Sequence, residues 1–288
     1  MGYRNLEVVG ISYKHIVITL FNLRRVWLAD KNRNDTDTKR WLEERFQLFD
    51  KYCFPSLSNQ TNKNFTWLCF FDEGTPIEYI ERINEYKSRC PQMIPCYFND
   101  KHMEDWVSSI KDTVSSYISD YEYIITTNVD NDDMIHLNMV NRIQEEFKKR
   151  QEVGVYSMLY GYQYFVSNHL LLKMYYPHSH FLSLVERNSP AFSTIKGHTH
   201  GEMRKLFKRV DIEDEPYWIE CVHSTNVNND LRITSRIKYY PILKAVSLKD
   251  FGFNQVLTKG MNVKNALFVL PGLFFKTAYN KLKKKAKK

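Results

Sequence analysis

Residues 123–133 read YIITTNVDNDD, a run of strand-forming residues that ends in three carboxylates within four positions. Tyr, Ile, Thr and Val favour a strand, and the pattern over residues 134–149 predicts a helix directly after it. Ligands of open α/β sheets bind beyond the carboxyl ends of the strands. The stretch therefore predicts that Asp130, Asp132 and Asp133 lie at the rim of a binding site.

The spacing of these acids favours a divalent cation. Asp130 and Asp132 repel each other unless a cation lies between them, and Mg²⁺ or Mn²⁺ binds such oxygens while keeping positions open for substrate phosphates. A solvated acidic turn that caps the next helix is the alternative, since Asp is favoured there. An EF-hand is excluded, because Met134 and Ile135 occupy the positions of a further ligand and of the required glycine.

Composition indicates a globular protein of a reducing compartment. The 288 residues are 43% hydrophobic, which suits one large α/β domain or a domain with an appendage. The five cysteines form no CxxC pair, and their odd number argues against a disulfide framework. The first 20 residues lack the apolar core of a secretory signal, so we expect a cytoplasmic protein.

The net charge of +8 is concentrated at the C-terminal end of the sequence. Seven lysines lie in the last 13 residues with no acid among them, which leaves +1 on residues 1–275. The body therefore lacks the basic stripe of a nucleic-acid-binding protein, and we expect no nucleic acid partner.

The sequence changes character after residue 250. Residues 266–275 are apolar and run into the lysines, but ten residues cannot span a bilayer, which takes about 20. We expect a catalytic domain over residues 1–250 and a helical tail over residues 251–288 that attaches to an anionic membrane surface. The expected location is peripheral, on the inner face of the cell membrane. A solubilising tail after a docked helix is the alternative.

Strand and helix patterns alternate along the first half of the chain. Strands are predicted over residues 15–23, 65–71, 93–98 and 121–129, with helices between them. The alternation predicts an α/β fold with a largely parallel sheet that is flanked by helices and joined by right-handed crossovers. Polar side chains that follow these strands are candidates for ligand contact, namely Arg24, Arg25 and Asp72.

The second half of the chain is predicted to add strands that border the cleft. Residues 153–165 are β-rich and interrupted by Gly161, which indicates a hairpin, and residues 217–222 have the last convincing strand pattern. Residues 181–187 form a further predicted strand that ends in an acid, which makes Glu186 the leading candidate for a general base or an acceptor contact. An ion pair near Arg187 is the alternative for Glu186.

Five motifs occur in a fixed order along the chain. They are WLxxRFxLF at 41–49, PSLxxQ at 55–60, FxW at 65–67, FDxxTP at 71–76 and TxxDNDD at 127–133. In this order they resemble the putative rhamnosyltransferase family of bacterial glycosyltransferases, over roughly residues 15–225. The resemblance implies a GT-A-like fold, in which the Asp-rich motif of a nucleotide-binding α/β sheet holds a divalent cation against the donor diphosphate.

The resemblance also implies roles for single residues. Asp132 is the expected metal ligand, Asp130 contacts the donor ribose or the metal, and Asp133 supports them. A late histidine completes the metal or diphosphate shell in many GT-A enzymes, which indicates His223 as a ligand. A histidine that only bonds to the backbone is the alternative.

One departure from the family motif concerns charge. The family has Arg-Leu before the first of these acids, whereas this chain has Asn128 and Val129. A positive group near the donor phosphates is then missing from that position. Arg24, Arg25 or a lysine could replace it, or the donor could differ from that of other members.

The expected function is a metal-dependent glycosyl transfer. By the resemblance, a sugar such as rhamnose moves from a nucleotide diphosphate to a cell-surface glycan or its lipid-linked precursor. Mn²⁺ or Mg²⁺ stabilises the leaving diphosphate, and a carboxylate takes the acceptor proton if the reaction inverts the anomeric centre. Two alternatives stay open, a metal-dependent sugar-phosphate transferase and a non-catalytic glycan-binding or membrane-scaffold protein.

Overall fold

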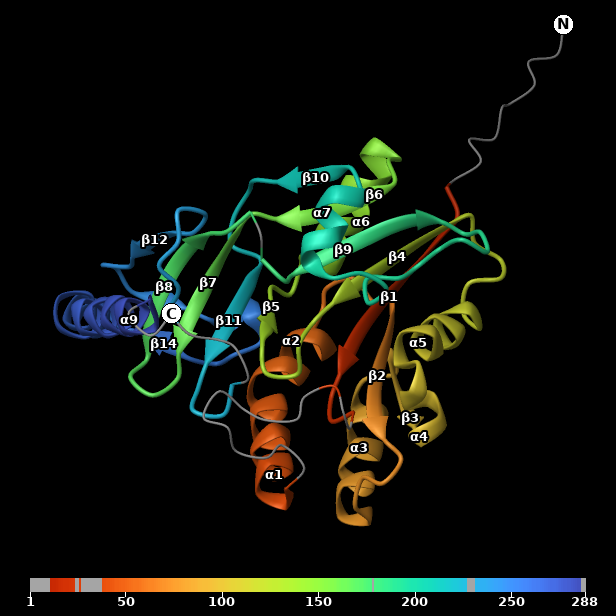
Figure 1. The fold of residues 1–288 in the computed structure, drawn as a ribbon, viewed down its shortest axis with the longest axis horizontal. Helices are drawn as coiled ribbons and strands as arrows, with labels where there is room; N and C mark the ends of the chain where they lie inside the picture. The colour runs from red at the N-terminus through yellow and green to blue at the C-terminus, as the bar shows by residue number, and fades with distance from the viewer. Residues whose placement is uncertain (1–10, 24–25, 27–37, 178, 227–230, 286–288) are drawn as a thin grey trace, which may run out of the picture.

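The central sheet has seven strands: β1 (Tyr13–Leu20), β2 (Thr66–Asp72), β3 (Met93–Phe98), β4 (Tyr123–Asn128), β6 (Gly154–Met158), β9 (Leu182–Arg187) and β10 (Arg209–Ile212). The computed structural model describes residues 11–23, 26, 38–177, 179–226 and 231–285. The strand order is β10-β6-β9-β4-β1-β2-β3 (Figure 1). Neighbouring strands are parallel except where β9 pairs with β4 and β6. The expected α/β fold with a largely parallel sheet is confirmed.

Helices cover both faces of this sheet. Side chains alternate between the faces along each strand, so each face presents apolar residues that must be buried. Val17 and Trp67 pack on one face, and Ile16 and Leu68 pack on the other. The first face is covered by α1 (Lys39–Leu48), η1 (Phe49–Cys53), α2 (Phe54–Ser58), α3 (Ile77–Arg89) and α6 (Met139–Arg150). The second face is covered by α4 (Asp100–Glu104), α5 (Trp106–Ser115) and α7 (His200–Leu206).

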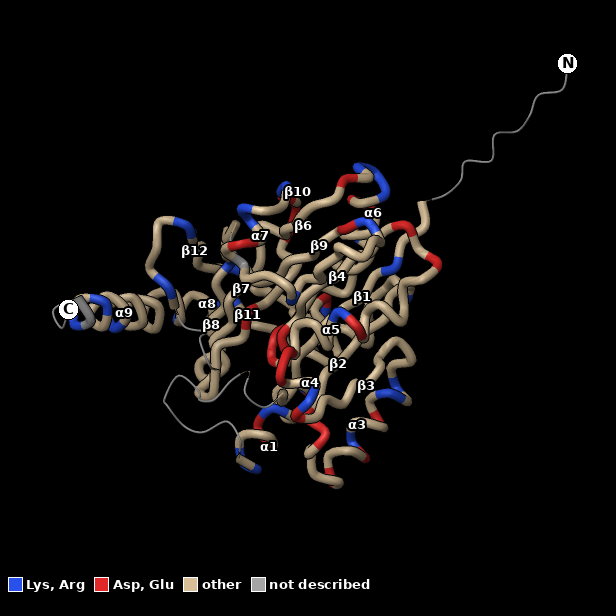
Figure 2. The backbone as a smooth tube through the Cα atoms, turned by 45° about the vertical axis from the view of Figure 1, so that its right-hand side comes forward, with Lys and Arg blue, Asp and Glu red and all other residues tan. Residues whose placement is uncertain are grey.

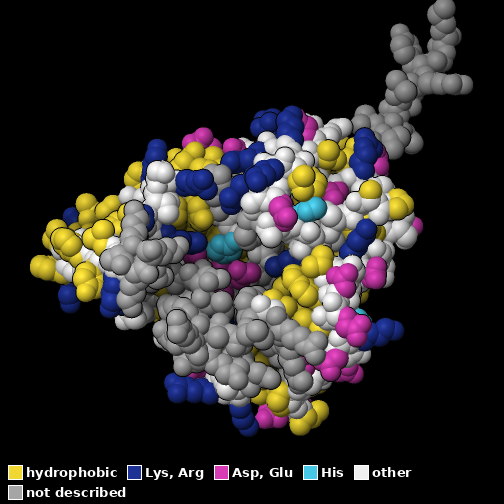
Figure 3. Space-filling model, in the orientation of Figure 1, with side chains coloured by type: hydrophobic (Ala, Val, Ile, Leu, Met, Phe, Trp, Pro, Cys, Tyr) yellow, Lys and Arg dark blue, Asp and Glu magenta, His cyan; other side chains and the backbone are white. Residues whose placement is uncertain are grey.

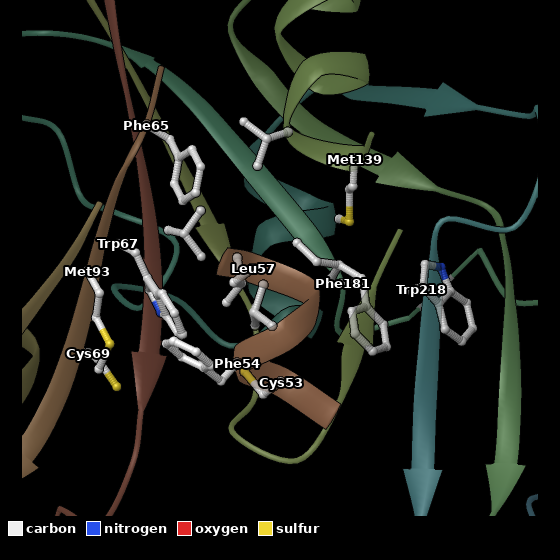
Figure 4. Packing of buried hydrophobic residues seen from close by; sticks show 14 of the residues in the cluster. Cys53, Phe54, Leu57, Phe65, Trp67, Cys69, Met93, Met139, Phe181 and Trp218 are labelled. Atoms are coloured by element: carbon white, nitrogen blue, oxygen red, sulfur yellow. The ribbon is translucent and has the colours of Figure 1, made fainter. Parts of the chain in front are cut away.

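Aromatic packing fixes α1 and α2 against the first face. Phe46 of α1 stacks on Tyr79 of α3 with ring centroids 4.6 Å apart. Phe54 of α2 lies 6.2 Å from Trp67 of β2, and Figure 4 shows the two side chains in one buried group. The indole nitrogen of Trp67 donates to Thr19 Oγ1 at 3.0 Å, so its polar atom is satisfied in the core. These contacts hold α1 in one place beside the acidic loop.

A second sheet lies beside the first and contains β5 (Met134–Ile135), β7 (Tyr160–Phe165), β8 (Leu170–Tyr175), β11 (Trp218–Val222) and β12 (Lys238–Pro241). Its order is β12-β8-β7-β11-β5. The predicted helix over 134–149 is wrong at its start, because Met134 and Ile135 pair with β11 and α6 begins at Met139. Pairing with a distant strand overrides the local helical pattern there.

The hairpin predicted over residues 153–165 is also wrong. The chain passes from β6 in the central sheet directly to β7 in the second sheet, so the two strands do not pair with each other. Gly161 in β7 packs against the indole of Trp218, and a Cβ atom at this position would lie 2.1 Å from the ring. A glycine is needed at this close approach.

The C-terminal region folds onto the second sheet. It contains β13 (Val246–Ser247), η2 (Lys249–Phe251), β14 (Val256–Leu257), α8 (Lys259–Lys264), η3 (Asn265–Val269) and α9 (Leu270–Lys285). Leu270 is buried beside Leu172 of β8, and Asn265 Nδ2 donates to Asn168 O at 3.0 Å. The expected C-terminal helix is present, and Figure 2 shows lysines along α9 at one end of the molecule. In the described ranges, the helices are too short or too polar to cross a membrane.

Candidate active site

The acidic loop follows β4 at the carboxyl edge of the central sheet. Asn131 ties the loop to the end of β1, because its Nδ2 donates to Phe21 O at 2.7 Å. Asp132 and Asp133 are buried, whereas the side chain of Asp130 is 40% exposed. Figure 3 shows acidic, basic and histidine side chains grouped near the middle of one face. The edge predicted from the sequence therefore presents one accessible carboxylate above two buried ones.

Asp132 is held by a cation of the protein itself. Arg45 of α1 donates from Nη1 to Asp132 Oδ2 at 2.7 Å, and from Nη2 to Thr225 O at 2.8 Å. His223 Nε2 lies 2.8 Å from the same Oδ2 atom, and Asn226 Nδ2 donates to it at 3.2 Å. Burial opposes ionisation of Asp132, but the charge of Arg45 and the contact with His223 hold its pKa below the usual range.

A second group contains Asp130, Asp133 and His180. His180 Nε2 lies 2.9 Å from Asp133 Oδ2 and 3.8 Å from Asp130 Oδ2. Within the described part of the chain, these three residues offer ligand atoms that all lie within 4.8 Å of one another. The other oxygen of Asp133 accepts the backbone N–H of Cys221 in β11 at 2.8 Å, which fixes the carboxylate. The group therefore joins the two sheets at the acidic edge.

Burial and neighbouring charges perturb the protonation of Asp133 and His180 in this second group. Burial and the charges of Asp132 and Asp130 raise the pKa of Asp133, although the hydrogen bond with His180 opposes the rise. Burial disfavours protonation of His180, but Asp133 and Asp130 outweigh it and raise its pKa to about 9. The residues fit a divalent cation, because two carboxylates and one imidazole are ligands that Mn²⁺ accepts and the carboxylates suit Mg²⁺.

The structure separates the predicted metal ligands into the two groups just described. Asp132 and His223 are in direct contact with each other and with Arg45 or Asn226, whereas Asp130 lies beside His180. A guanidinium already occupies the position beside Asp132 where a metal would compensate its charge. The geometry therefore favours Asp130 and Asp133 over Asp132 as cation ligands.

The predicted donor contacts have different locations. Asp72 ends β2 at the same carboxyl edge, where its Oδ1 accepts the N–H of Gly74 at 2.8 Å and shapes the turn. Asn22 links it to β1, because Asn22 Oδ1 accepts the N–H of Asp72 at 3.2 Å. Arg24 and Arg25 lie outside the described residues.

Glu186 lies far from the acidic loop. It is opposite Ile124 in the antiparallel pair of β9 with β4, six residues before Asp130, which corresponds to roughly 20 Å along a strand. Its carboxylate accepts hydrogen bonds from the N–H groups of Ser193 at 2.9 Å and Thr194 at 3.0 Å. The position does not support a role as general base, since a base must reach the acceptor hydroxyl at the donor site.

Three functional candidates were not predicted from the sequence, namely Arg45, His180 and Lys196. Arg45 belongs to a helical motif, but its pattern alone does not indicate a contact with residue 132. His180 lies in a loop before β9, and Lys196 lies in a loop after it. Their roles depend on contacts between segments more than 40 residues apart, which local patterns do not contain.

A largely parallel α/β sheet with carboxylates at its carboxyl edge belongs to the class of α/β proteins that bind ligands at this edge. Residues 24–235 match the sequence profile of a family described as putative rhamnosyl transferase, and the chain belongs to this family. The description of this family is that of a glycosyltransferase. A search of curated proteins gave no match.

The solved structures that are similar to the chain include the following two. One is S. aureus TarS 1-349, at 11% identity and a TM-score of 0.42, covering 72% of this chain and 60% of that chain. The other is described as a putative nucleotide-diphospho-sugar transferase from Desulfovibrio desulfuricans G20, at 9% identity and a TM-score of 0.37, covering 72% and 82%. The chain thus matches less than two thirds of the TarS fragment.

Proposed function

We propose that this chain transfers a sugar, rhamnose by the family description, from a nucleotide diphosphate donor to a glycan or a lipid-linked glycan. A divalent cation at Asp130, Asp133 and His180 assists the reaction, as Mn²⁺ or Mg²⁺. The observation that carries the proposal is the convergence of these three side chains at the carboxyl edge of a sheet in a member of this family.

The roles of the protein groups follow from their burial. A bound cation would stabilise the negative charge on the leaving diphosphate. Asp133 is buried and its carboxylate is held by the N–H of Cys221, so it would hold the cation in a fixed position. Asp130 is exposed and faces the solvent from which a donor enters. Arg45 neutralises Asp132 and keeps the acidic loop in one conformation. Asp72 stays a proposed donor contact at the end of β2, which is separated from β4 by β1.

Product analysis tests this proposal. The protein is incubated with a panel of nucleotide sugars and Mn²⁺, with Asp130→Asn as the matched control, and the released nucleotide is identified. Release of a nucleoside diphosphate that the variant lacks is the expected result. Release of a nucleoside monophosphate would identify a sugar-phosphate transferase instead. No release from any donor would favour a non-catalytic glycan-binding or scaffold protein.

We also propose that residues 251–288 attach the catalytic domain, residues 1–250, to an anionic membrane surface on the cytoplasmic side. Within residues 266–275, Leu270 is buried and Leu273 and Phe274 pack against the body, whereas Leu267, Phe268 and Phe275 are exposed. Further along α9, Tyr279 and Leu282 are exposed with Phe275. Spacings of four and three residues place these three on one face of the helix, with lysines beside them.

A further inference from the structure

We propose that Lys196 binds a phosphate group of the nucleotide donor, and that a loop built against β4 holds the lysine in place. This inference rests on the proposed function and specifies how the chain recognises the negative charge of the donor. The loop is formed by residues 188–199, between β9 and α7.

Lys196 reaches the carboxyl edge of the sheet next to the proposed cation site. Its Nζ atom donates to Oδ1 of Asn128, which is the last residue of β4. The amide nitrogen of Asn128 in turn donates to Oδ1 of Asp130 at 3.3 Å. One side chain therefore separates the ammonium group of Lys196 from a carboxylate of the site.

The ammonium group has a neutral partner. Among the described residues, Lys196 belongs to no ion pair, and the nearby Asp130 lies beside His180 instead. Lys196 is half-buried, and burial lowers its pKa, while the charge of Asp130 favours the charged form. A positive charge in such a place is stabilised when an anion binds. A diphosphate that contacts both the cation and Lys196 supplies this anion.

Glu186 fixes the first part of the loop. One carboxylate oxygen accepts the N–H and the hydroxyl of Ser193, at 2.9 and 3.0 Å, and the other accepts the N–H of Thr194 at 3.0 Å. Three donors on one carboxylate make strong hydrogen bonds, since the acceptor is charged. Glu186 is therefore a positioning residue for the loop.

The rest of the loop follows β4 toward the site. Thr194 is buried, and its backbone has a left-handed conformation with φ of 69°, which turns the chain. The next residue, Ile195, donates its N–H to Thr126 Oγ1 at 2.8 Å. Thr126 and Asn128 are two residues apart in the strand and so point to the same face. Lys196 thus arrives at Asn128 from a loop that is already ordered.

Nucleotide binding by variants tests this inference. The probes are UDP, dTDP and GDP with Mg²⁺, measured by calorimetry, and the nucleoside that corresponds to the best binder, measured by ligand-observed NMR. The variants are Lys196→Gln, Lys196→Arg and, as a matched control, the exposed Lys149→Gln on α6. Lys196→Met replaces Lys196→Gln if the latter does not fold.

Lys196→Gln is expected to weaken diphosphate binding by about 10- to 100-fold, because a charged hydrogen bond is lost. Nucleoside binding stays unchanged, Lys196→Arg keeps most of the affinity, and Lys149→Gln behaves as wild type. Wild-type diphosphate affinity in the folded variant would overturn the role of Lys196 while leaving the proposed function intact. Equal loss of nucleoside affinity would make Lys196 a structural residue. Failure of the wild type to bind any of these diphosphates would contradict the proposed function as well.

Discussion

Arg45 Nη1 lies 2.7 Å from Asp132 Oδ2, and both side chains are more than nine-tenths buried. The pair joins α1 to the acidic loop across 87 positions of sequence. Arg45 also donates to Asn131 Oδ1 at 3.1 Å, so one guanidinium sets the conformation of two neighbouring loop residues. A buried charge pair of this kind specifies geometry rather than adding much stability, because desolvation offsets the attraction.

Removal of Arg45 is therefore expected to leave the buried carboxylate of Asp132 without its guanidinium partner, although His223 and Asn226 still contact it. Arg45→Met should lower the free energy of unfolding by about 3–5 kcal/mol, and the double variant Arg45→Met with Asp132→Asn should be more stable than the sum of the single losses predicts. Urea unfolding of the four proteins measures this coupling. Additive losses would mean that the two side chains do not interact in solution.

Much of the fold could be predicted from local patterns. The strand over residues 93–98 was predicted with its observed bounds, and the alternation of strands and helices gave the parallel part of the sheet. The direction of β9 was not predictable, because it depends on pairing with β4 and β6 far away in sequence. Glu186 is the leading candidate for a base in the sequence because the predicted strand over residues 181–187 ends in an acid. Since β9 is antiparallel, its end lies at the other edge.

The site was predictable only in part, for a related reason. Residues 130–133 carry their own signal, since strand composition and acids are adjacent in sequence. The partners of these acids come from α1, from the loop before β9 and from the segment after β11. Whether His180 or His223 lies beside Asp130 depends on how the two sheets meet, and no local pattern contains that information.

His15 predicts how stability depends on pH. It is buried between Thr127 Oγ1 at 2.8 Å and Gln144 Nε2 at 3.3 Å, and burial lowers its pKa to about 3. Below its unfolded pKa of about 6.5, the unfolded chain binds a proton that the folded chain does not. The contribution of His15 to the free energy of unfolding is therefore complete above about pH 6.5. It is lost as the pH falls toward 3, by up to about 1.4 kcal/mol per pH unit.

Urea unfolding at several pH values between about 7 and about 5 checks this dependence against a variant without the imidazole. His15→Gln is expected to be less stable at neutral pH but to have a flatter pH profile. Parallel profiles of the two proteins would mean that another group causes the acid destabilisation.

Glu186→Gln is expected to weaken nucleoside diphosphate binding by about 3- to 10-fold, since the amide holds the loop less strongly than the carboxylate. Turnover at saturating donor should change little. Calorimetry and steady-state kinetics separate the two effects, with the exposed Glu122→Gln as control. A fall in turnover of about 10²-fold or more with unchanged donor affinity would instead support Glu186 as the general base.

Membrane attachment should depend on the exposed face of α9. Phe275 is 76% exposed and Tyr279 is 65% exposed. Replacement of both by Ser should lower binding to phosphatidylglycerol-containing vesicles by at least about tenfold, because apolar insertion is lost. Ile77→Ser, at an equally exposed apolar residue of α3, should have no effect. Sedimentation with vesicles measures both, and equal binding of the two variants would exclude this face as the contact.

The metal site itself is tested most directly by counting bound Mn²⁺ with electron paramagnetic resonance, in the presence of the nucleoside diphosphate that binds best. His180 and His223 form a matched pair, since each lies within 2.9 Å of an aspartate of the same loop. We predict that the wild type binds Mn²⁺, that His180→Asn weakens this binding by at least about 100-fold, and that His223→Asn retains it. Retained Mn²⁺ binding in His180→Asn together with its loss in His223→Asn would contradict this ligand set. It would identify Asp132 and His223 as the metal ligands instead.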